Sequence, residues 1–259
     1  MGIIGGSLGY NLLKWISARR GVAFGLTGYM DGSAYANRSK LEVLLGSDIW
    51  ERINGKVAVD FGCGSGAEAV EMASRGASCV IGVEKRAEAI AEARALAARA
   101  GVSDRCIFTT AADQSADIII ALDSFEHFED PALILRIMRR IVKPDGALLC
   151  SFGPTWYHPL GGHGFSIFPY AHLVFTESAF MRWRADYVDD GARVFREVGT
   201  GLNQMTIRRF KQIIAESEWD MESFEAVPIR KLRRFANRFT QEFTTAIVRC
   251  RLRPKNTAG

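Results

Sequence analysis

The stretch VAVDFGCGSGAEAVEMASRGASCVIGVEK, residues 57–85, decides the fold of this chain. An apolar run at 57–61 leads into three glycines between positions 62 and 66, and an amphipathic helical pattern follows. A second apolar run, at 79–83, ends at Glu84. This order predicts a strand, a glycine turn, a helix and a second, parallel strand, with a cleft at the edge where the strands end.

The alternation of strands and helices continues to residue 152. Further strands are expected at 106–110, 117–123 and 147–152, and helices at 67–75, at 86–100 and from Pro131, which Asp130 caps. After the segment 153–203, a helix is expected at 206–219 and strands at 222–229 and 243–252. The predicted fold class is α/β, with a Rossmann-like, doubly wound and mostly parallel sheet and a cap inserted after the fifth strand.

The composition is that of an ordinary globular protein, with 48% hydrophobic and 24% charged residues among 259. Apolar runs such as 118–122 are much shorter than the roughly 20 residues that a membrane-spanning helix needs. The five cysteines are scattered and contain no CxxC pair, which indicates reduced thiols and argues against disulfides or a zinc site. We therefore expect a cytoplasmic protein.

The chain is predicted to form one domain built from four segments. These are 1–38, an N-terminal lid segment; 39–152, the core; 153–203, the cap; and 204–259, a C-terminal helix and strand pair. The cap holds ten aromatic residues, which either line a pocket for a flat or hydrophobic molecule or form the cap's own core. In the first segment, Tyr29, Tyr35 and Arg38 are candidates to close over a ligand.

A basic run, IRKLRRFANRF at 229–239, stands out against a net charge of only +4. Such a run is either a solvated face or a contact surface for a phosphate-rich partner or an anionic lipid surface.

Two classes of ligand fit the glycine turn. Gly62, Gly64 and Ala67 satisfy the dinucleotide pattern GxGxxG/A, and Glu84 at the end of the second strand could bind the ribose of NAD. Asp60, two residues before the first glycine, adds a carboxylate ahead of the turn.

The stretch VDFGCGSG resembles the signature of class I methyltransferases that depend on S-adenosylmethionine (SAM). SFEHFEDP and VKPDGALLCSF resemble segments of small-molecule methyltransferases of the type similar to ubiquinone-biosynthesis O-methyltransferases, so the resemblance covers 57–152. It implies that the two C-terminal strands form an antiparallel hairpin. PTWYHPLGGH and LNQMT are similar to stretches in a group of bacterial stand-alone methyltransferases.

The resemblance implies SAM as the cofactor. The cofactor-binding residues it implies are Asp60, Gly62, Cys63, Gly64, Glu84, Lys85, Asp113 and Asp123. Among them, Asp60 is expected to orient the ammonium of SAM, Glu84 to accept both ribose hydroxyls and Asp113 to lie beside the adenine. A carboxylate suits a diol because it offers two charged acceptors. Since SAM has no phosphates, the glycines would let its methionine portion lie against the loop.

Methyl transfer requires alignment above all, and it requires a base only where the acceptor must lose a proton. We expect His163, in the loop after the fifth strand, to be that base or to orient the acceptor, with Tyr157 assisting. The alternative for His163 is a histidine satisfied by local backbone. His127, in DSFEH, is a further catalytic candidate whose alternative role is structural. Asp123, Glu126 and His127 match positions that can hold a divalent metal in the family resembled, but we assign no metal.

The predicted function is methyl transfer from SAM to a small-molecule acceptor, at oxygen. The alternatives are another SAM reaction such as cyclisation or decarboxylation, an RNA methyltransferase, and a SAM-binding module without catalysis. LDSF stands where methylases of DNA bases carry [DNS]PP[YFW], which weighs against that class. We expect no nucleic-acid partner, no transmembrane segment and at most a weak peripheral membrane contact. The oligomeric state stays open.

Overall fold

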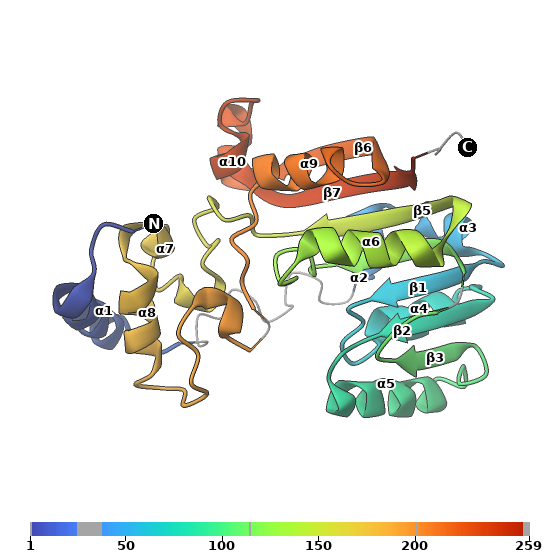
Figure 1. Ribbon diagram of the computed structural model, residues 1–259, viewed down its shortest axis with the longest axis horizontal. Coiled ribbons are helices and arrows are strands. Elements are labelled where there is room, and N and C mark those ends of the chain that lie inside the picture. The colour runs from blue at the N-terminus through green and yellow to red at the C-terminus, as the bar shows by residue number, and fades with distance from the viewer. Residues whose placement is uncertain (1, 25–37, 114, 200, 256–259) are drawn as a thin grey trace.

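One mixed sheet organises the structure, a computed structural model that describes residues 2–24, 38–113, 115–199 and 201–255. Its seven strands lie in the order β3-β2-β1-β4-β5-β7-β6 (Figure 1). They are β1 (Val57–Phe61), β2 (Cys79–Val83), β3 (Cys106–Thr109), β4 (Ala116–Leu122), β5 (Val142–Phe152), β6 (Trp219–Pro228) and β7 (Thr245–Pro254). The strands β1 to β5 pair in parallel, whereas β7 is antiparallel to both β5 and β6. The predicted sheet and its C-terminal hairpin are confirmed.

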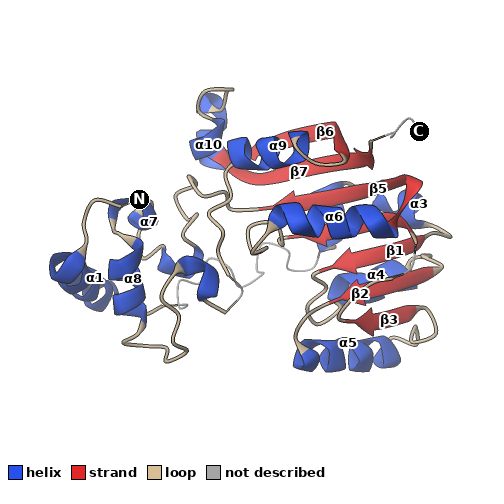
Figure 2. Ribbon diagram, viewed as in Figure 1, coloured by secondary structure: helices blue, strands red, loops and turns tan. Residues whose placement is uncertain are grey.

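Helices cover both faces of the sheet, as Figure 2 shows. One face packs against α6 (Pro131–Ile141) and α9 (Ile207–Ala215). The opposite face packs against α2 (Lys40–Leu45), α3 (Ile49–Ile53), α4 (Ala67–Ser74) and α5 (Ala87–Arg99). The sheet is therefore doubly wound, as predicted. Every helix in the described part of the chain is too short or too polar to span a bilayer.

Helix α6 illustrates how the sequence sets these elements. The side chain of Asp130 accepts a hydrogen bond from Leu133 N at 2.9 Å, and Pro131 occupies the first turn, so the predicted cap is confirmed. Leu135 and Met138, one turn apart, are fully buried on the sheet.

The parallel register places the ends of the central strands side by side. Phe61 of β1 pairs with Val83 of β2, and Asp60 lies between Gly82 and Ile120 of β4. The residues that follow β1, β2 and β4 consequently meet at one edge of the sheet, called here the carboxyl edge.

Some bounds differ from the sequence prediction. The strand β5 begins at Val142 and not at residue 147, because Val142 pairs with Ala116 before a register irregularity. Helix α9 stops at Ala215, since Trp219 starts β6 and is buried with its Nε1 donating to Leu135 O at 3.0 Å.

The cap forms a second body beside the sheet (Figure 1) and includes α7 (Ala171–Val174) and α8 (Glu177–Arg184). Its core also takes in α1 (Gly6–Arg20) from the N-terminal segment, and Ile4 forms a parallel bridge with Phe175. Residues 2–24 thus share a core with the cap. Tyr29 and Tyr35 lie outside the described residues, and Arg38 is exposed, so the lid role of this segment stays a prediction.

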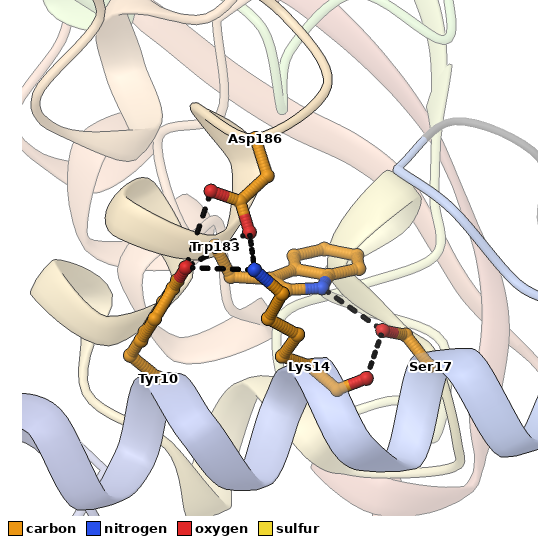
Figure 3. Close-up of polar contacts among 5 residues, drawn as sticks. All are labelled: Tyr10, Lys14, Ser17, Trp183 and Asp186. Atoms are coloured by element: carbon orange, nitrogen blue, oxygen red, sulfur yellow. Dashed lines mark hydrogen bonds and ion pairs between the residues drawn. The ribbon is translucent and has the colours of Figure 1, made fainter.

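The contact between α1 and α8 combines a buried indole with an exposed ion pair (Figure 3). Trp183 Nε1 donates to Ser17 Oγ at 3.1 Å, and that hydroxyl donates to Lys14 O at 3.0 Å. At the surface, Lys14 Nζ lies 3.3 Å from Asp186 Oδ2, and the Tyr10 hydroxyl donates to the same carboxylate at 3.1 Å. The indole is fully buried, whereas the lysine side chain is 58% exposed. Burial of apolar surface therefore dominates this interface.

Trp183→Ala should lower the free energy of unfolding by about 3–5 kcal/mol, because it opens a cavity in the cap core. Lys14→Gln, which removes only the exposed ion pair, serves as the matched control and should leave the urea midpoint nearly unchanged. Urea denaturation followed by circular dichroism measures both. Equal losses in the two variants would contradict the dominance of the buried indole.

Candidate functional site

The glycine loop between β1 and α4 has two sides with different roles. Gly62, Gly64 and Gly66 all have positive φ, at 88°, 51° and 81°. A Cβ at Gly66 would lie 2.6 Å from the Cβ of Ala93, so this glycine lets α5 pack against the loop. At Gly64 the nearest atom to such a Cβ among the described residues is 4.0 Å away, a terminal nitrogen of Arg86. No other described residue crowds the backbone at Gly64 on this side.

Asp60 is a buried carboxylate beneath this loop. It is 4% exposed, and its Oδ2 has no hydrogen-bond partner within the described residues. Burial, with a smaller contribution from Glu68, raises the pKa of Asp60 to about 8, although Lys40 opposes the shift. Lys40 Nζ itself lies 3.0 Å from Asp123 and 3.7 Å from Glu68. A buried acid with an unsatisfied oxygen is suited to a cationic ligand.

Glu84, at the end of β2, is also buried but is fully engaged. Its carboxylate accepts hydrogen bonds from Gly64 N at 3.2 Å, and from Arg86 N and Nε at 3.0 and 3.1 Å. Burial alone would raise the pKa of Glu84. The hydrogen bonds and charge of Arg86 outweigh this effect, so the pKa is lowered. Glu84 is therefore ionised at neutral pH.

The other predicted cofactor residues lie around these two acids. Lys85 and Asp113 are exposed, and Asp123 is half-buried with φ 48° at the end of β4. Cys63 is 4% exposed; its N–H donates to Val83 O at 3.1 Å and its thiol packs beneath the loop. Burial raises the pKa of that thiol, which leaves it protonated. Lys85, Asp113 and Asp123 thus follow the ends of β2, β3 and β4 at the carboxyl edge, and the binding roles stay predictions.

Two histidines from distant segments face each other beside the cleft. The rings of His127, after β4, and His163, in the cap, have centroids 5.2 Å apart at an angle of 74°. Together with Glu126, they offer ligand atoms that all lie within 4.8 Å of one another. Asp123, which the sequence grouped with Glu126 and His127, pairs with Lys40 instead. The third member of the cluster comes from the cap, and local sequence spacing gave no signal for it.

Backbone contacts fix both rings and leave one nitrogen unsatisfied. His127 Nδ1 lies 2.7 Å from Gly201 O, and His163 Nδ1 lies 3.1 Å from Gly161 O. His163 Nε2 is buried and has no partner among the residues described. Burial lowers the pKa of both histidines, with the neighbouring His127 adding to the effect on His163, whose pKa falls to about 4. The pair is therefore neutral at physiological pH.

Glu126 lies beneath this pair and is 1% exposed. Its Oε1 accepts from Gly153 N at 3.0 Å, while its Oε2 has no partner within the described part of the chain. Burial, followed by the charge of Asp123, raises the pKa of Glu126 to about 8. The cluster could hold a hard or borderline cation only after this carboxyl loses its proton.

Most of the cap's aromatics are excluded from any pocket wall, because they form the cap's own core. The fully or almost fully buried rings are Trp156, Phe165, Phe175, Phe180, Trp183 and Phe195. Tyr157 is half-buried, and its ring lies 5.2 Å from that of Phe243 in α10 (Gln241–Thr244). The structure thus decides between the two roles that the sequence left open for the aromatic segment.

A hollow of about 810 Å³ lies at the opposite edge of the sheet, lined by residues such as Pro144, Asp220 and Lys255. None of the predicted site residues lines it. Its mixed charges and its distance from the glycine loop give it no part in the site.

The central stretch of the chain has recognisable relatives. Residues 59–150 match a family described as a methyltransferase domain. The ubiquinone biosynthesis O-methyltransferase of Neisseria meningitidis serogroup C (strain 053442) is 37% identical over 106 residues, which are 38% of this chain and 44% of that protein. The enzyme of the same name from Pseudomonas aeruginosa (strain LESB58) is 35% identical over 103 residues, again 38% and 44%. The chain thus spans less than half of the length of these relatives.

Solved structures share the fold over a longer stretch. The [4+2]-cyclase SpnF superposes with a TM-score of 0.53 at 17% identity, covering 80% of each chain. An S-adenosylmethionine-dependent methyltransferase from Mesorhizobium loti gives a TM-score of 0.52 at 17% identity, covering 78% of this chain and 92% of that one. Identity this low shows the fold alone, and one fold hosts different reactions. The predicted fold class and the predicted family resemblance are confirmed.

The buried acids make stability depend on pH. The unfolded chain loses the Glu126 proton near the ordinary glutamate pKa of 4.5, whereas the folded chain keeps it up to about pH 8. Above the ordinary histidine pKa of 6.5, the histidines are neutral in both states, so the window from pH 6.5 to 8 reports on the acids alone. Stability should therefore fall as pH rises across this window, because the folded state binds more protons.

Glu126→Gln should reduce this slope by about half, since Asp60 contributes a similar dependence. Thermal unfolding of the ligand-free protein at several pH values across the window measures it. Equal slopes for the variant and the natural chain would show that Glu126 is not held protonated.

Proposed function

We propose that this protein transfers a methyl group from SAM to an oxygen of a small-molecule acceptor, because residues 59–150 match a methyltransferase domain. One observation carries the proposal. Gly64, whose N–H donates to Glu84, the unsatisfied Asp60 Oδ2 and the ionised Glu84 all lie next to the glycine loop at the carboxyl edge. This set suits a ligand that has an ammonium at one end and a ribose at the other.

SAM supplies an electrophilic methyl group when it is bound. We assign its ammonium to Asp60, its ribose hydroxyls to Glu84 and its adenine to the exposed Asp113. An ammonium beside Asp60 would lower the raised pKa of that carboxyl and satisfy its free oxygen. This assignment also explains why the site buries an acid with one unsatisfied oxygen.

The side chain of Arg86 occupies the position that we propose for the ribose. Its Nε donates to Glu84, and its Nη2 lies 4.0 Å from the position of a Cβ on Gly64, so it covers the open side of the loop. Because the arginine side chain is 50% exposed, it can move into solvent at little cost. Binding of SAM would exchange the Arg86 contacts of Glu84 for two ribose hydroxyls.

Glu84→Ala should weaken SAM binding by about 100-fold, because it removes two charge-assisted hydrogen bonds. Arg86→Ala should instead strengthen it, since it frees the carboxylate. Isothermal calorimetry with SAM, S-adenosylhomocysteine and NAD measures both, with the exposed Glu88→Ala as the control. Unchanged affinity in Glu84→Ala would remove the ribose from this position, and binding of NAD alone would overturn the cofactor.

His163 is the proposed base for an acceptor hydroxyl. Its Nε2 is neutral, buried and unpartnered, and it sits beside the cleft against His127. As the new oxygen–carbon bond forms and the sulfur–carbon bond breaks, the hydroxyl proton would pass to this nitrogen. The adjoining ring of His127 disfavours a second positive charge nearby, so only one imidazolium forms at a time. We assign Tyr157 to the acceptor side because it lies in the same segment of the cap.

His163→Ala should lower kcat by about 100-fold or more while leaving SAM affinity unchanged. His158→Ala is the matched control, because burial also lowers the pKa of His158 to about 4 but its Nδ1 only accepts from Leu160 N. In the natural enzyme at saturating SAM, so that Asp60 is already occupied, kcat/KM for the acceptor should stay level down to about pH 5 and then fall, following the lowered pKa of His163. A normal kcat in His163→Ala would exclude it as the base.

The choice of oxygen is supported by the relatives of residues 59–150, which are named O-methyltransferases. The segment boundaries 1–38, 39–152, 153–203 and 204–259 are likewise proposed, supported by the separate core of the cap. We place the protein in the cytoplasm, which fits its five free cysteines.

A further inference from the structure

Residues 229–244, which join β6 to β7 and are called here the β6–β7 loop, form a folded projection at the carboxyl edge (Figure 1). Ile229 N donates to Thr244 O at 2.7 Å and closes its base. At its tip, Phe239 N donates to Asn237 Oδ1 at 2.9 Å, and Thr240 Oγ1 donates to Phe235 O at 2.6 Å. The loop therefore holds a defined shape, although its short helix at Arg230–Phe235 contains no buried residue.

Three phenylalanines of this loop face solvent. Phe235 is 53% exposed, Phe239 is 78% exposed and Phe243 is 46% exposed. Phenylalanine has no polar atom to place in water, so a cluster of this kind on a fixed projection marks a contact surface.

The loop is also strongly positive. Its cations are Arg230, Lys231, Arg233, Arg234 and Arg238. Its one acid, Glu242, accepts hydrogen bonds from Ile207 N and Arg208 N at 3.0 and 2.8 Å and so caps α9. No ion pair found within the described residues includes a cation of this loop. The charge of the loop is therefore available to an anionic partner.

The strands on either side of the loop behave differently. There, Arg249 pairs with Glu225 at 3.2 Å, and Arg253 pairs with Glu222 at 2.6 Å. The unbalanced charge is thus confined to the projection and is not a general property of the hairpin.

The exposed rings and the cations are interleaved. The guanidinium of Arg234 lies 4.7 Å from the ring centroid of Phe235, and that of Arg238 lies 4.5 Å from the ring centroid of Phe239. Each ring thus carries a charge beside it, which matches the boundary between lipid headgroups and acyl chains. Both rings remain more than half exposed, so they can enter the acyl boundary while the neighbouring cations stay on lipid phosphates.

We propose that the β6–β7 loop binds the anionic surface of a membrane, with Phe235 and Phe239 at the acyl boundary and the arginines on lipid phosphates. The contact between Phe243 and Tyr157 joins this surface to the cap segment that leads to His163. Membrane binding would therefore bring the edge of the cleft close to the lipid. The proposal does not depend on methyl transfer.

The test is co-sedimentation of the full chain, without SAM, with vesicles of phosphatidylcholine alone or with about 30% phosphatidylglycerol. Binding should be at least about tenfold tighter to the anionic vesicles, because each cation near the surface contributes about fivefold. The double variants Phe235→Ser/Phe239→Ser and Arg233→Gln/Arg234→Gln should each lose about tenfold or more.

Matched controls lie on α6. Leu133→Ser removes an apolar side chain that is 44% exposed, and Arg136→Gln/Arg140→Gln removes two exposed cations. Both controls should bind as the natural chain does. Circular dichroism establishes that the loop variants are folded.

Absence of vesicle binding by the natural chain, or an equal loss in the α6 controls, would overturn the proposal. So would tight binding of a single-stranded RNA oligonucleotide that needs the arginines but not the phenylalanines, since the loop would then be a nucleic-acid surface. Vesicle binding by a chain that fails to bind SAM in calorimetry would overturn the proposed function and leave this inference standing.

Discussion

The parallel pairing of β1 with β2 and β4 is the constraint on which the site depends. It brings the residues after three strands to one edge and buries three carboxylates there, those of Asp60, Glu84 and Glu126. Within the described part of the chain, Glu84 is the one of the three that pairs with a cation. Asp60 has one oxygen without a partner among the described residues. Its pKa is raised because burial destabilises the charged carboxylate more than Lys40 stabilises it. A cation bound in the cleft would remove this imbalance, so the sheet can be regarded as prepared for a positively charged ligand.

The cap contributes His163 to the histidine pair, whereas its aromatic residues form the cap's own core. Its rings pack on one another and on α1, which makes it a body that can hold a backbone loop in place. Two hydrogen bonds from Asn203 Nδ2, to Phe125 O at 2.6 Å and Phe128 O at 2.8 Å, tie the end of the cap to the segment that carries His127. The result is a neutral histidine pair shared between the two bodies. The fold is shared with proteins of other activities, so the sheet alone does not define the reaction.

Acidic and basic side chains are concentrated in different places. Buried acids lie beside the glycine loop, and exposed cations lie on the β6–β7 loop. At the glycine loop and the histidine pair, burial raises the pKa of Asp60 and of Glu126, and the half-exposed Arg86 pairs with Glu84. On the β6–β7 loop, cations stand beside exposed rings, without any ion pair to offset them among the residues described. Both features lie at the carboxyl edge, and the contact between Tyr157 and Phe243 links them.

The sequence by itself determined the order of strands, the glycine turn, the doubly wound sheet and the two acids beside the turn, because periodicity and turn residues act over short stretches of chain. It also identified the basic run at 229–239. Only the tertiary structure decided that Gly66 is needed for packing, whereas Gly64 has no close neighbour among the described residues. It also decided that Arg86 donates to Glu84 and that the ring of His163 contacts that of His127. The contact between His163 and His127 depends on how the cap packs against the sheet, which no local sequence pattern encodes. For the same reason, the aromatic segment could be assigned to the cap's own core only once its burial was known.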